Sequence, residues 1–326
     1  MQLSILDQSP IPEGFTSGDA LRNSISLARL ANRVGYKRYW VAEHHGTPGL
    51  ACTSPEVLIG PIAAATSRIR VGSGGVMLPH YSPLKVAENF NMLSGLYPGR
   101  IDLGIGRAAG TSPAVARALQ RDRRQPAPDD FPDQLDELLR LTGNGEQGKG
   151  AQPWLLGSSP QSAIWAAELG LPYVFADFIN SDGASIARDY RKRFRPSRYA
   201  ETPQLGVACW AICADTDEQA MRLSYSFRMM MRLLLRGRLV AVPTVETAER
   251  FLEQDTAPSL YPARRVITGT PATVRDALKS LAAEYGADEI LIVNIMYDHD
   301  ARLRSYELIA DAFQLSATNF VAVAAQ

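Results

Sequence analysis

Residues 69–107, IRVGSGGVMLPHYSPLKVAENFNMLSGLYPGRIDLGIGR, contain two short apolar runs with a helical pattern between them. The runs are Ile69–Gly72 and Ile101–Ile105, and the apolar residues of 86–93 recur at intervals of three and four. Short apolar runs are typical of buried strands, and the three-to-four spacing is typical of a helix. The stretch therefore predicts one strand–helix–strand unit with two parallel strands.

The same alternation continues in both directions along the chain. Eight apolar runs qualify as strands: Leu3–Asp7, Tyr39–Ala42, Ile69–Gly72, Ile101–Ile105, Trp154–Gly157, Tyr173–Ala176, Gly206–Ile212 and Glu289–Asn294. Alternating strands and helices favour parallel pairing with right-handed crossovers. Eight such units predict an α/β fold in which one (β/α)8 TIM barrel spans residues 1–326. An open doubly wound sheet is the alternative.

One segment, Arg236–Arg265, does not fit the repeat. It holds one glycine and three prolines around a helical stretch, Glu246–Gln254. Glycine and proline interrupt regular structure, so the segment is not an ordinary βα unit. We interpret it as an insertion before the last βα unit and as a candidate lid.

Composition and charge exclude two classes of partner. Of 326 residues, 46% are hydrophobic, and 34 basic side chains balance 34 acidic ones. A neutral chain without a long basic run gives no electrostatic reason to expect a nucleic-acid or membrane partner. The three cysteines form no CxxC pair, and the N-terminus lacks the basic and apolar regions of a secretory signal. We expect a cytoplasmic protein.

A hydroxyl residue followed by proline stands before several helical patterns. The pairs are Ser54-Pro55, Ser82-Pro83, Ser112-Pro113, Ser159-Pro160 and Thr270-Pro271. Proline fits the first position of a helix, and the preceding serine or threonine is able to cap it. These pairs predict helix starts after strand ends, at a face where helix N-termini attract anions. Capping alone is the alternative for most of them.

Two of the four histidines lie together where a strand ends. Glu43-His44-His45 follows the predicted strand Tyr39–Ala42, and barrels carry their active sites at the carboxyl ends of their strands. Free imidazole titrates near pH 6.5, so a histidine there is able to exchange protons at working pH. We interpret the pair as catalytic, with a structural role as the alternative.

A metal site is a further interpretation of the same histidines. His80, in the loop after the third strand, would supply a third ligand, as catalytic zinc commonly requires. Adjacent residues at a strand end tend to point in opposite directions, which makes joint ligation by His44 and His45 awkward. We expect no metal.

The fourth and fifth strands end in groups that suit a phosphate. Arg107 follows the fourth strand between glycines, and its forked donors fit a phosphate or a carboxylate. Gly157-Ser158-Ser159-Pro160 ends the fifth strand and opens a helix that contains Ser162. Hydroxyl and free N–H groups at a helix start bind anions. These neighbouring strand ends are expected to hold one phosphate, with an ion pair of Arg107 to a strand-end acid as the alternative.

Five motifs together resemble bacterial luciferase and its relatives, the luciferase-like monooxygenases, in the non-luminescent flavin-dependent branch. They are Tyr39-Trp40-Val41-Ala42-Glu43-His44-His45, Val71–Leu78, Gly99–Arg107, Trp154–Ser159 and Asp298–Leu308. Their order and spacing carry the resemblance. It implies a TIM barrel that binds an FMN-type cofactor in its reduced form.

The resemblance also assigns roles to residues. The cofactor-binding residues that it implies are Glu43, Gly74, Gly75, Arg107, Ala109, Ser158, Ser159 and Ser162. Among them, Gly74 and Gly75 match a non-proline cis peptide beneath the flavin ring, and Arg107 with the serines matches the phosphate site. His44 matches the catalytic base of the family.

The function implied is that of a monooxygenase that uses reduced FMN and O₂ on a small organic substrate. A separate flavin reductase would supply the reduced FMN as a transient partner. Two alternatives remain open. One is an oxidoreductase that uses a 5-deazaflavin, and the other is a catalytically silent flavin-binding protein.

The resemblance and two helices predict a homodimer. The helices that begin at Ser54-Pro55 and Ser82-Pro83 carry more apolar residues than one barrel face needs: Val57, Leu58, Ile62, Val86, Phe90 and Leu93. Relatives dimerise through the corresponding helices, so we expect a two-fold symmetric pair. The alternative is that these side chains only cover the barrel.

Overall fold

The computed structural model describes residues 1–107, 112–119, 129–142, 150–256 and 265–316. Its strands are β1 (Gln2–Asp7), β2 (Arg38–Val41), β3 (Arg70–Met77), β4 (Ile101–Gly106), β5 (Gln152–Gly157), β6 (Tyr173–Ala176), β7 (Leu205–Cys213), β8 (Val266–Gly269) and β9 (Glu289–Val293). Its α-helices are α1 (Ser17–Val34), α2 (Pro55–Ala64), α3 (Pro83–Leu96), α4 (Pro113–Leu119), α5 (Phe131–Thr142), α6 (Pro160–Glu168), α7 (Ala184–Arg193), α8 (Asp217–Leu223), α9 (Tyr225–Leu235), α10 (Val245–Gln254), α11 (Pro271–Tyr285) and α12 (His299–Ala312).

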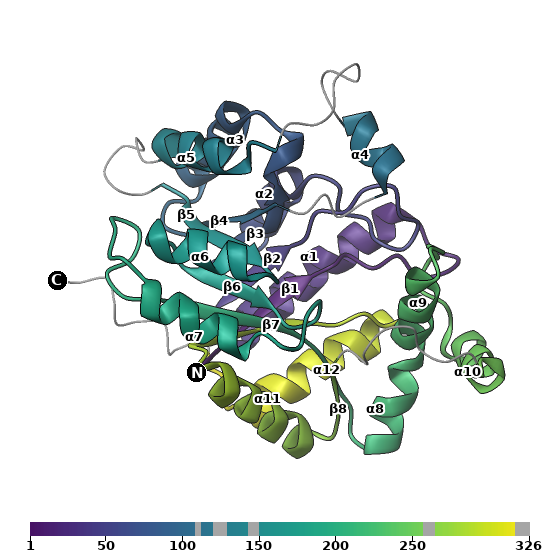
Figure 1. Cartoon of the computed structure of the whole chain (residues 1–326). Coiled ribbons are helices and arrows are strands. Elements are labelled where there is room, and N and C mark those ends of the chain that lie inside the picture. The colour runs from purple at the N-terminus through teal and green to yellow at the C-terminus, as the bar shows by residue number, and fades with distance from the viewer. Residues whose placement is uncertain (108–111, 120–128, 143–149, 257–264, 317–326) are drawn as a thin grey trace.

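Eight of the strands close into a parallel barrel. β1 to β7 pair in chain order, and β9 lies between β7 and β1. The pairing of β6 with β7 closes the ring. Figure 1 shows the helices around the outside of the strands. The predicted TIM barrel is confirmed, and each of the eight predicted strands is present.

A ninth strand, β8, lies outside the ring and was missed from the sequence. β6 pairs with one edge of β7 only as far as Ala208. Beyond that point Trp210–Cys213 pair with β8, because β9 occupies the opposite edge at Trp210. The strand was overlooked because Val266–Gly269 is short and follows the irregular segment directly.

The predicted insertion is larger than the sequence suggested. Between β7 and β9 the chain adds α8, α9, α10 and β8 before α11 covers the barrel. The predicted segment Arg236–Arg265 is only a part of this addition, and its residues 257–264 lie outside the described ranges. Its predicted helical stretch is α10 (Val245–Gln254). Figure 1 shows α8, α9 and α10 grouped on one side of the barrel.

We expected the third strand to end at its glycines. In the structure it continues through them to Met77. Ser73 pairs with Leu103 and Val76 pairs with Ile105, so β3 has one extra residue opposite β4. A bulge of this kind re-aims the chain at a barrel rim. The glycines are needed because the chains lie close together: a Cβ on Gly75 would lie 2.8 Å from the carbonyl oxygen of Gly104.

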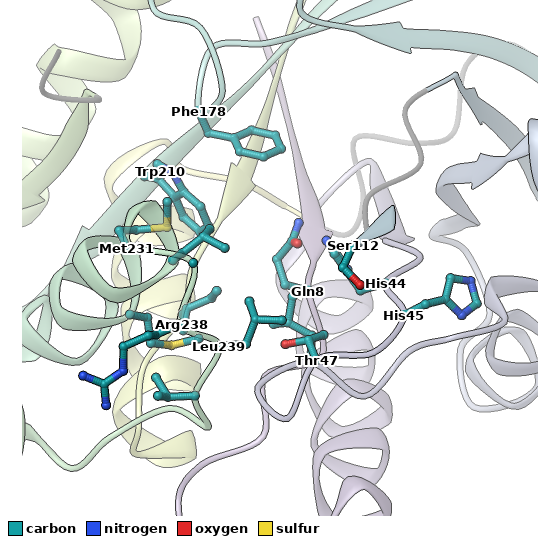
Figure 2. A pocket seen from close by; sticks show the side chains of 16 residues that line it. Gln8, His44, His45, Thr47, Ser112, Phe178, Trp210, Met231, Arg238 and Leu239 are labelled. Carbon is teal, nitrogen blue, oxygen red and sulfur yellow. The ribbon is translucent and has the colours of Figure 1, made fainter. Parts of the chain in front are cut away.

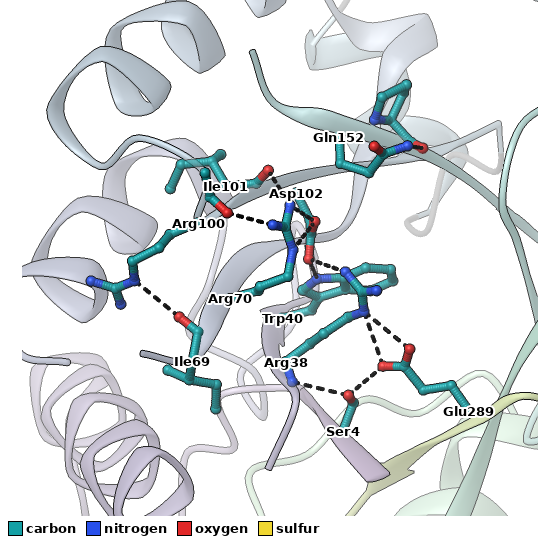
Figure 3. A network of polar contacts seen from close by, with 12 residues as sticks. Ser4, Arg38, Trp40, Ile69, Arg70, Arg100, Ile101, Asp102, Gln152 and Glu289 are labelled. Carbon is teal, nitrogen blue, oxygen red and sulfur yellow. Dashed lines mark hydrogen bonds and ion pairs between the residues drawn. The ribbon is translucent and has the colours of Figure 1, made fainter. Parts of the chain in front are cut away.

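Charged residues fill the barrel at the amino-terminal ends of its strands (Figure 3). Arg38 at the start of β2 donates to Asp102 at 2.8 Å and to Glu289 at 3.0 Å, and its Cζ lies 4.5 Å from the Trp154 ring centroid. Trp40 also donates to Asp102, at 3.0 Å. Burial is costly for a charge unless it is paired and hydrogen-bonded, as these are. This end of the barrel is therefore a packed, structural plug.

At the five hydroxyl–proline pairs, the prediction of a helix start at the proline is confirmed, whereas the predicted capping by the hydroxyl side chain is found at only some of them. α2, α3, α4, α6 and α11 each begin at the proline. Thr270 caps its helix through its side chain, but Ser54, Ser82 and Ser159 make no side-chain cap hydrogen bond. Capping therefore does not account for the Ser159 hydroxyl.

Most of the apolar residues that we expected to exceed the needs of one barrel pack against it instead. The buried ones are Leu58, Ile62, Val86, Phe90 and Leu93. Val57 on α2 is 70% exposed. On α3, Met92 is 67% exposed and Leu96 is 68% exposed, and neither of these two was singled out from the sequence.

Among the described helices, none is long and apolar enough to cross a membrane.

Candidate active site

Two cavities meet at the carboxyl ends of the strands. The first, which we call the glycine chamber, has a volume of about 580 Å³ and is lined by Gly74, Gly75, Gly106 and Gly157 among others. The second, the apolar chamber, has a volume of about 450 Å³ and is lined by residues of β7, α9 and the segment after α9. Gln8, His44 and Phe178 line both, so the two chambers adjoin at these side chains.

The glycine chamber brings together all the predicted cofactor residues that the structure describes. They come from the ends of four strands: Glu43 and His44 after β2, Gly74 and Gly75 in β3, Arg107 after β4, and Ser158, Ser159 and Ser162 after β5. Ala109 lies outside the described residues. The sequence reasoning therefore selected one site and not scattered positions.

The floor of this chamber is formed by the bulge in β3. The Gly74–Gly75 peptide bond is cis, as the resemblance implied. A Cβ on Gly74 would lie 2.3 Å from Leu6 Cδ1, so the strand has no room there for a side chain. Bare backbone at this point allows a flat ligand to approach closely.

Arg107 and two serines form the polar end of the glycine chamber. Arg107 is exposed, and its Cζ lies 5.6 Å from the Trp165 ring centroid. Among the described residues no carboxylate lies within ion-pair distance of it, so the structure does not show the ion pair that was the alternative. Ser158 and Ser159 line the same chamber as Arg107. The guanidinium and the Ser158 hydroxyl have no hydrogen-bond partner among the described residues, and the Ser159 hydroxyl has only a long contact of 3.5 Å to the Ser162 hydroxyl.

Ser162 has a different environment from its neighbours. It is buried, and its hydroxyl donates to the carbonyl oxygen of Ser159 at 2.8 Å and lies 2.9 Å from the Tyr173 hydroxyl. A Cβ on Gly157 would lie 2.2 Å from this hydroxyl. These contacts hold the first turn of α6 against the end of β5 and against the Tyr173 side chain of β6, so Ser162 positions the serine loop.

His44 lies where the two chambers join. Its backbone N–H donates to the Cys52 carbonyl at 2.9 Å, which fixes the loop after β2. Its Nδ1 is buried and has no hydrogen-bond partner among the described residues. Burial lowers the pKa of His44 to about 4, and the neighbouring His45 contributes in the same direction. The imidazole is therefore neutral at pH 7, with a nitrogen free to accept a proton.

Glu43 and His45 form the support of this loop. The Glu43 carboxylate accepts from the Met77 backbone N–H at 2.9 Å and from the Tyr81 hydroxyl at 2.7 Å, and it lies 2.7 Å from His45 Nε2. The end of β2 is thereby tied to the end of β3. The Glu43 side chain is engaged in these contacts, so a ligand in the chamber meets its backbone.

The histidines do not converge as metal ligands would. His45 is paired with Glu43, and its ring packs edge-on against His80 at 6.2 Å between centroids. Figure 2 shows the His45 ring directed away from the other labelled side chains. Among the described residues, no group of three or more His, Cys, Asp or Glu side chains is placed to hold a metal ion.

The apolar chamber was not predicted from the sequence. Its walls are Leu50, Phe178, Trp210, Met230, Met231, Leu234, Leu239, Val240 and Ile295, with Gln8, Thr47, Ser112 and Arg238 as polar members. Figure 2 shows Gln8 between Trp210 and Met231 on one side and Ser112 and His44 on the other. One signal was available: Gln8 directly follows the first predicted strand, at the face where function was expected.

The segment after α9 forms part of this wall and is fixed at its far end. Residues 237–240 line the chamber. Val242 donates to the Ile11 carbonyl and accepts from the Glu13 N–H, each at 2.8 Å. A Cβ on Gly49 would lie 2.4 Å from the Val240 carbonyl oxygen, so the loop after β2 also packs closely against the segment.

Comparison with known proteins places this site in a family. Residues 1–289 match the family described as luciferase-like monooxygenase. A protein of that name from Escherichia coli is 40% identical, covering 94% of this chain and 96% of its own. The N-acetyl-S-alkylcysteine monooxygenase of Bacillus subtilis is 39% identical, with 96% and 98% covered. The crystal structure of apo-MsnO8 is 41% identical, with 97% and 99% covered and a TM-score of 0.91.

More distant structures share the fold with different cofactors. The oxygenating constituent of 3,6-diketocamphane monooxygenase from Pseudomonas putida, solved with FMN, is 20% identical (97% and 98% covered, TM-score 0.74). An F420-dependent secondary alcohol dehydrogenase is 14% identical (95% and 98% covered, TM-score 0.65). At such identities the likeness shows the fold alone. The family match over residues 1–289 and the relatives near 40% identity carry the assignment: the chain belongs to the luciferase-like monooxygenase family of enzymes.

Proposed function

We propose that the protein is a monooxygenase that uses reduced FMN and O₂ to oxidise a small organic substrate. The observation that carries this proposal is the junction of two cavities at a neutral, buried histidine. One cavity has a glycine floor and a free arginine, and the other has apolar walls. A flavin in the first would face a substrate in the second across His44.

The residues of the glycine chamber fit FMN. Gly74 and Gly75 leave bare backbone where a flat ring system would lie, and Arg107, Ser158 and Ser159 leave unused donors where its phosphate would lie. When bound and reduced, FMN would supply the electrons that activate O₂. The chain's part is to orient the cofactor, to keep water from it with apolar walls, and to accept or donate a proton at His44.

The same arrangement supports a proposal about the size of the substrate. The apolar chamber has a volume of about 450 Å³, which lies within the range of sites that bind small molecules. The Bacillus subtilis relative acts, by its name, on N-acetyl-S-alkylcysteines. We propose that a separate flavin reductase delivers the reduced FMN, and that residues 237–240 act as a lid over the substrate.

The main competitor is a deazaflavin cofactor. A structure of the same fold at 14% identity is F420-dependent. The Arg107 and serine end is compatible with any phosphate, so phosphate contacts do not discriminate between the two cofactors. Direct competition between FMN and F420 for the wild-type protein does. Turnover with reduced FMN, O₂ and test substrates separates the monooxygenase from a silent flavin binder, and turnover with reduced F420 identifies the deazaflavin enzyme.

Arg107→Ala is expected to weaken FMN binding by roughly tenfold to a hundredfold while riboflavin binding barely changes. A charge-assisted contact to the phosphate contributes about 1.5–3 kcal/mol to FMN binding. Riboflavin has no phosphate, so the substitution removes no such contact from it. Quenching of flavin fluorescence on titration measures both affinities. Arg100→Ala is unsuited as a control because the Arg100 guanidinium donates to the carbonyl oxygens of Ala63, Thr66 and Ile69 and to the Thr66 hydroxyl. Arg117→Gln on α4 changes another arginine of this face, outside the chamber, and should leave both affinities unchanged. Equal losses for FMN and riboflavin in Arg107→Ala would refute the phosphate role.

We also propose that α2 and α3 pair two chains as a homodimer. Val57, Met92 and Leu96 are each about two-thirds exposed or more, and α2 packs against α3, so they offer apolar surface on adjoining helices. Light scattering at micromolar concentration should give twice the 35.6 kDa chain mass. Met92→Glu with Leu96→Glu should give single chains, whereas Met221→Glu on α8 should not. A single-chain mass for the wild type would contradict the proposal.

A further inference from the structure

The apolar chamber has an open end and a buried end. Leu234 and Leu239 are 43% and 45% exposed, and Arg238 is exposed too. At the other end Gln8 is 4% exposed and Ile295 is 5% exposed. Figure 2 shows Arg238 on the opposite side of the chamber from His44 and Ser112. A bound molecule therefore has one end at Arg238 and the other at Gln8 and His44.

Among the described residues that line the chamber, Arg238 is the one Arg, Lys, Asp or Glu side chain. None of the described lining residues is Asp or Glu, and burial keeps His44 neutral by lowering its pKa to about 4. The rest of the wall is mostly apolar. A charge beside apolar walls interacts more strongly with a ligand charge than it would in open water. The chamber is thus biased toward an anion.

Neighbouring arginines have side-chain partners, whereas the Arg238 side chain has none among the described residues. Arg236 and Arg232 both pair with Asp255, at 2.7 Å and 2.8 Å. Arg222 pairs with Glu246 at 2.8 Å. In the described part of the chain, no side-chain hydrogen bond or ion pair engages the Arg238 guanidinium. Its five donors are free at the mouth of the chamber.

The buried end has a second free polar group. No described residue hydrogen-bonds to the Gln8 carboxamide, although the side chain is almost fully buried and borders both chambers. A buried carboxamide without a partner is costly unless a ligand or water satisfies it. Gln8 is therefore placed to bind a polar group of the substrate beside His44.

We infer that the substrate is an apolar molecule with one carboxylate, which Arg238 binds at the mouth while the apolar body fills the chamber. The inference rests on the proposed function, because it takes the apolar chamber as the substrate site. It places the atom that is oxidised at the end remote from the carboxylate, beside Gln8 and His44. A neutral molecule of the same shape would lose the contact with Arg238.

The test compares octanoate with octanamide, which have nearly the same shape and differ in charge. Calorimetric titration of the full chain without flavin measures both affinities, so the result does not depend on turnover. The wild type should bind octanoate roughly tenfold more tightly, at the lower end for a charge-assisted contact because the arginine is exposed. Raised salt should reduce this preference. Arg238→Gln should abolish it and leave octanamide affinity unchanged, and Arg238→Lys should restore part of it.

Two matched variants complete the design. Arg236→Gln removes a paired arginine two residues away, and the octanoate preference should persist. Arg107→Gln removes the arginine of the glycine chamber, and this variant should also keep the preference for octanoate over octanamide. The inference is overturned if the wild type shows no saturable octanoate binding or no preference. It is also overturned if Arg107→Gln, and not Arg238→Gln, abolishes the preference. FMN titration of the same proteins tests the proposed function separately, since Arg238→Gln should bind FMN as the wild type does.

Discussion

Replacing His44 by glutamine should lower turnover by roughly 10²–10⁴ while FMN affinity changes little. This range is the usual contribution of a general acid or base. His44 borders both chambers, and its Nδ1 is buried without a partner among the described residues. It does not belong to the group of Arg107 and the serines that would bind the phosphate. Steady-state rates with a flavin reductase, NADH and a test substrate measure the first effect, and flavin fluorescence measures the second.

The pH profile distinguishes this role from a structural one. A free histidine would lose its base function below about pH 6.5. Burial lowers the pKa of His44 to about 4, so the neutral form persists on acidification well below that value. We expect the acid limb that depends on His44 to lie near pH 4, and to be missing from the residual activity of His44→Gln. A limb near pH 6.5 that His44→Gln removes would contradict the burial of this base.

His45→Gln is the matched control. It lies next in the chain, and a glutamine in its place is still able to donate to Glu43, so the loop should hold. Turnover should stay within a few-fold of the wild type. If His45→Gln proved as damaging as His44→Gln and bound metal were found in the wild type, a metal site would replace the proposed role. If neither change mattered, the silent flavin binder would be the better account.

Arg302→Met should reduce the free energy of unfolding by about 3–5 kcal/mol at neutral pH. Arg302 on α12 is 1% exposed and donates to Asp7 at 2.6 Å and to the Asn294 carbonyl at 3.1 Å. Removing one partner of a buried ion pair leaves the other charge unpaired, which carries a cost of this size. Asp7 ends β1 and precedes Gln8, so the same pair also fixes one wall of both chambers. Urea unfolding measures the loss.

The loss should shrink in acid. Burial alone would raise the pKa of Asp7, but Arg302 and the hydrogen bonds around it hold that pKa below 3.8. The pair therefore stabilises the wild type above about pH 4, and this contribution is lost as the pH falls through the folded pKa. Arg304→Met is the control, because Arg304 is exposed and pairs with Asp215 at 3.3 Å, so it should cost less than about 1 kcal/mol. Equal effects of the two variants would contradict the assignment.

The sequence was sufficient for the barrel because its signals are local. Apolar runs and three-to-four spacing recur with each unit, and α1 ends at Gly35 in the left-handed conformation that the glycine favours. The glycine chamber was also predictable, because parallel strands bring their carboxyl ends to one rim. Glu43 and Arg107 follow separate strands, so their positions alone place them at this rim, whereas Gly75 was assigned through the family resemblance.

The apolar chamber could not be predicted in this way. Met230 and Met231 lie on α9, in an addition that has no counterpart in the barrel repeat, and the pattern of α9 is that of any amphipathic helix. Whether Arg238 had a partner depended on where Asp255 lies, which the sequence does not specify. The glycines of β3 were interpreted as a strand end. Glycine is needed there because the chain passes close to Gly104 on the neighbouring strand, and the sequence does not show this contact. Non-local packing set each of these features.

The most direct test is titration of the wild-type chain with FMN, riboflavin and F420, followed by flavin absorbance and fluorescence. The account predicts saturation at one FMN per chain, with FMN bound more tightly than riboflavin and more tightly than F420. Absence of FMN binding, or a clear preference for F420, would contradict the central claim that the glycine chamber is an FMN site.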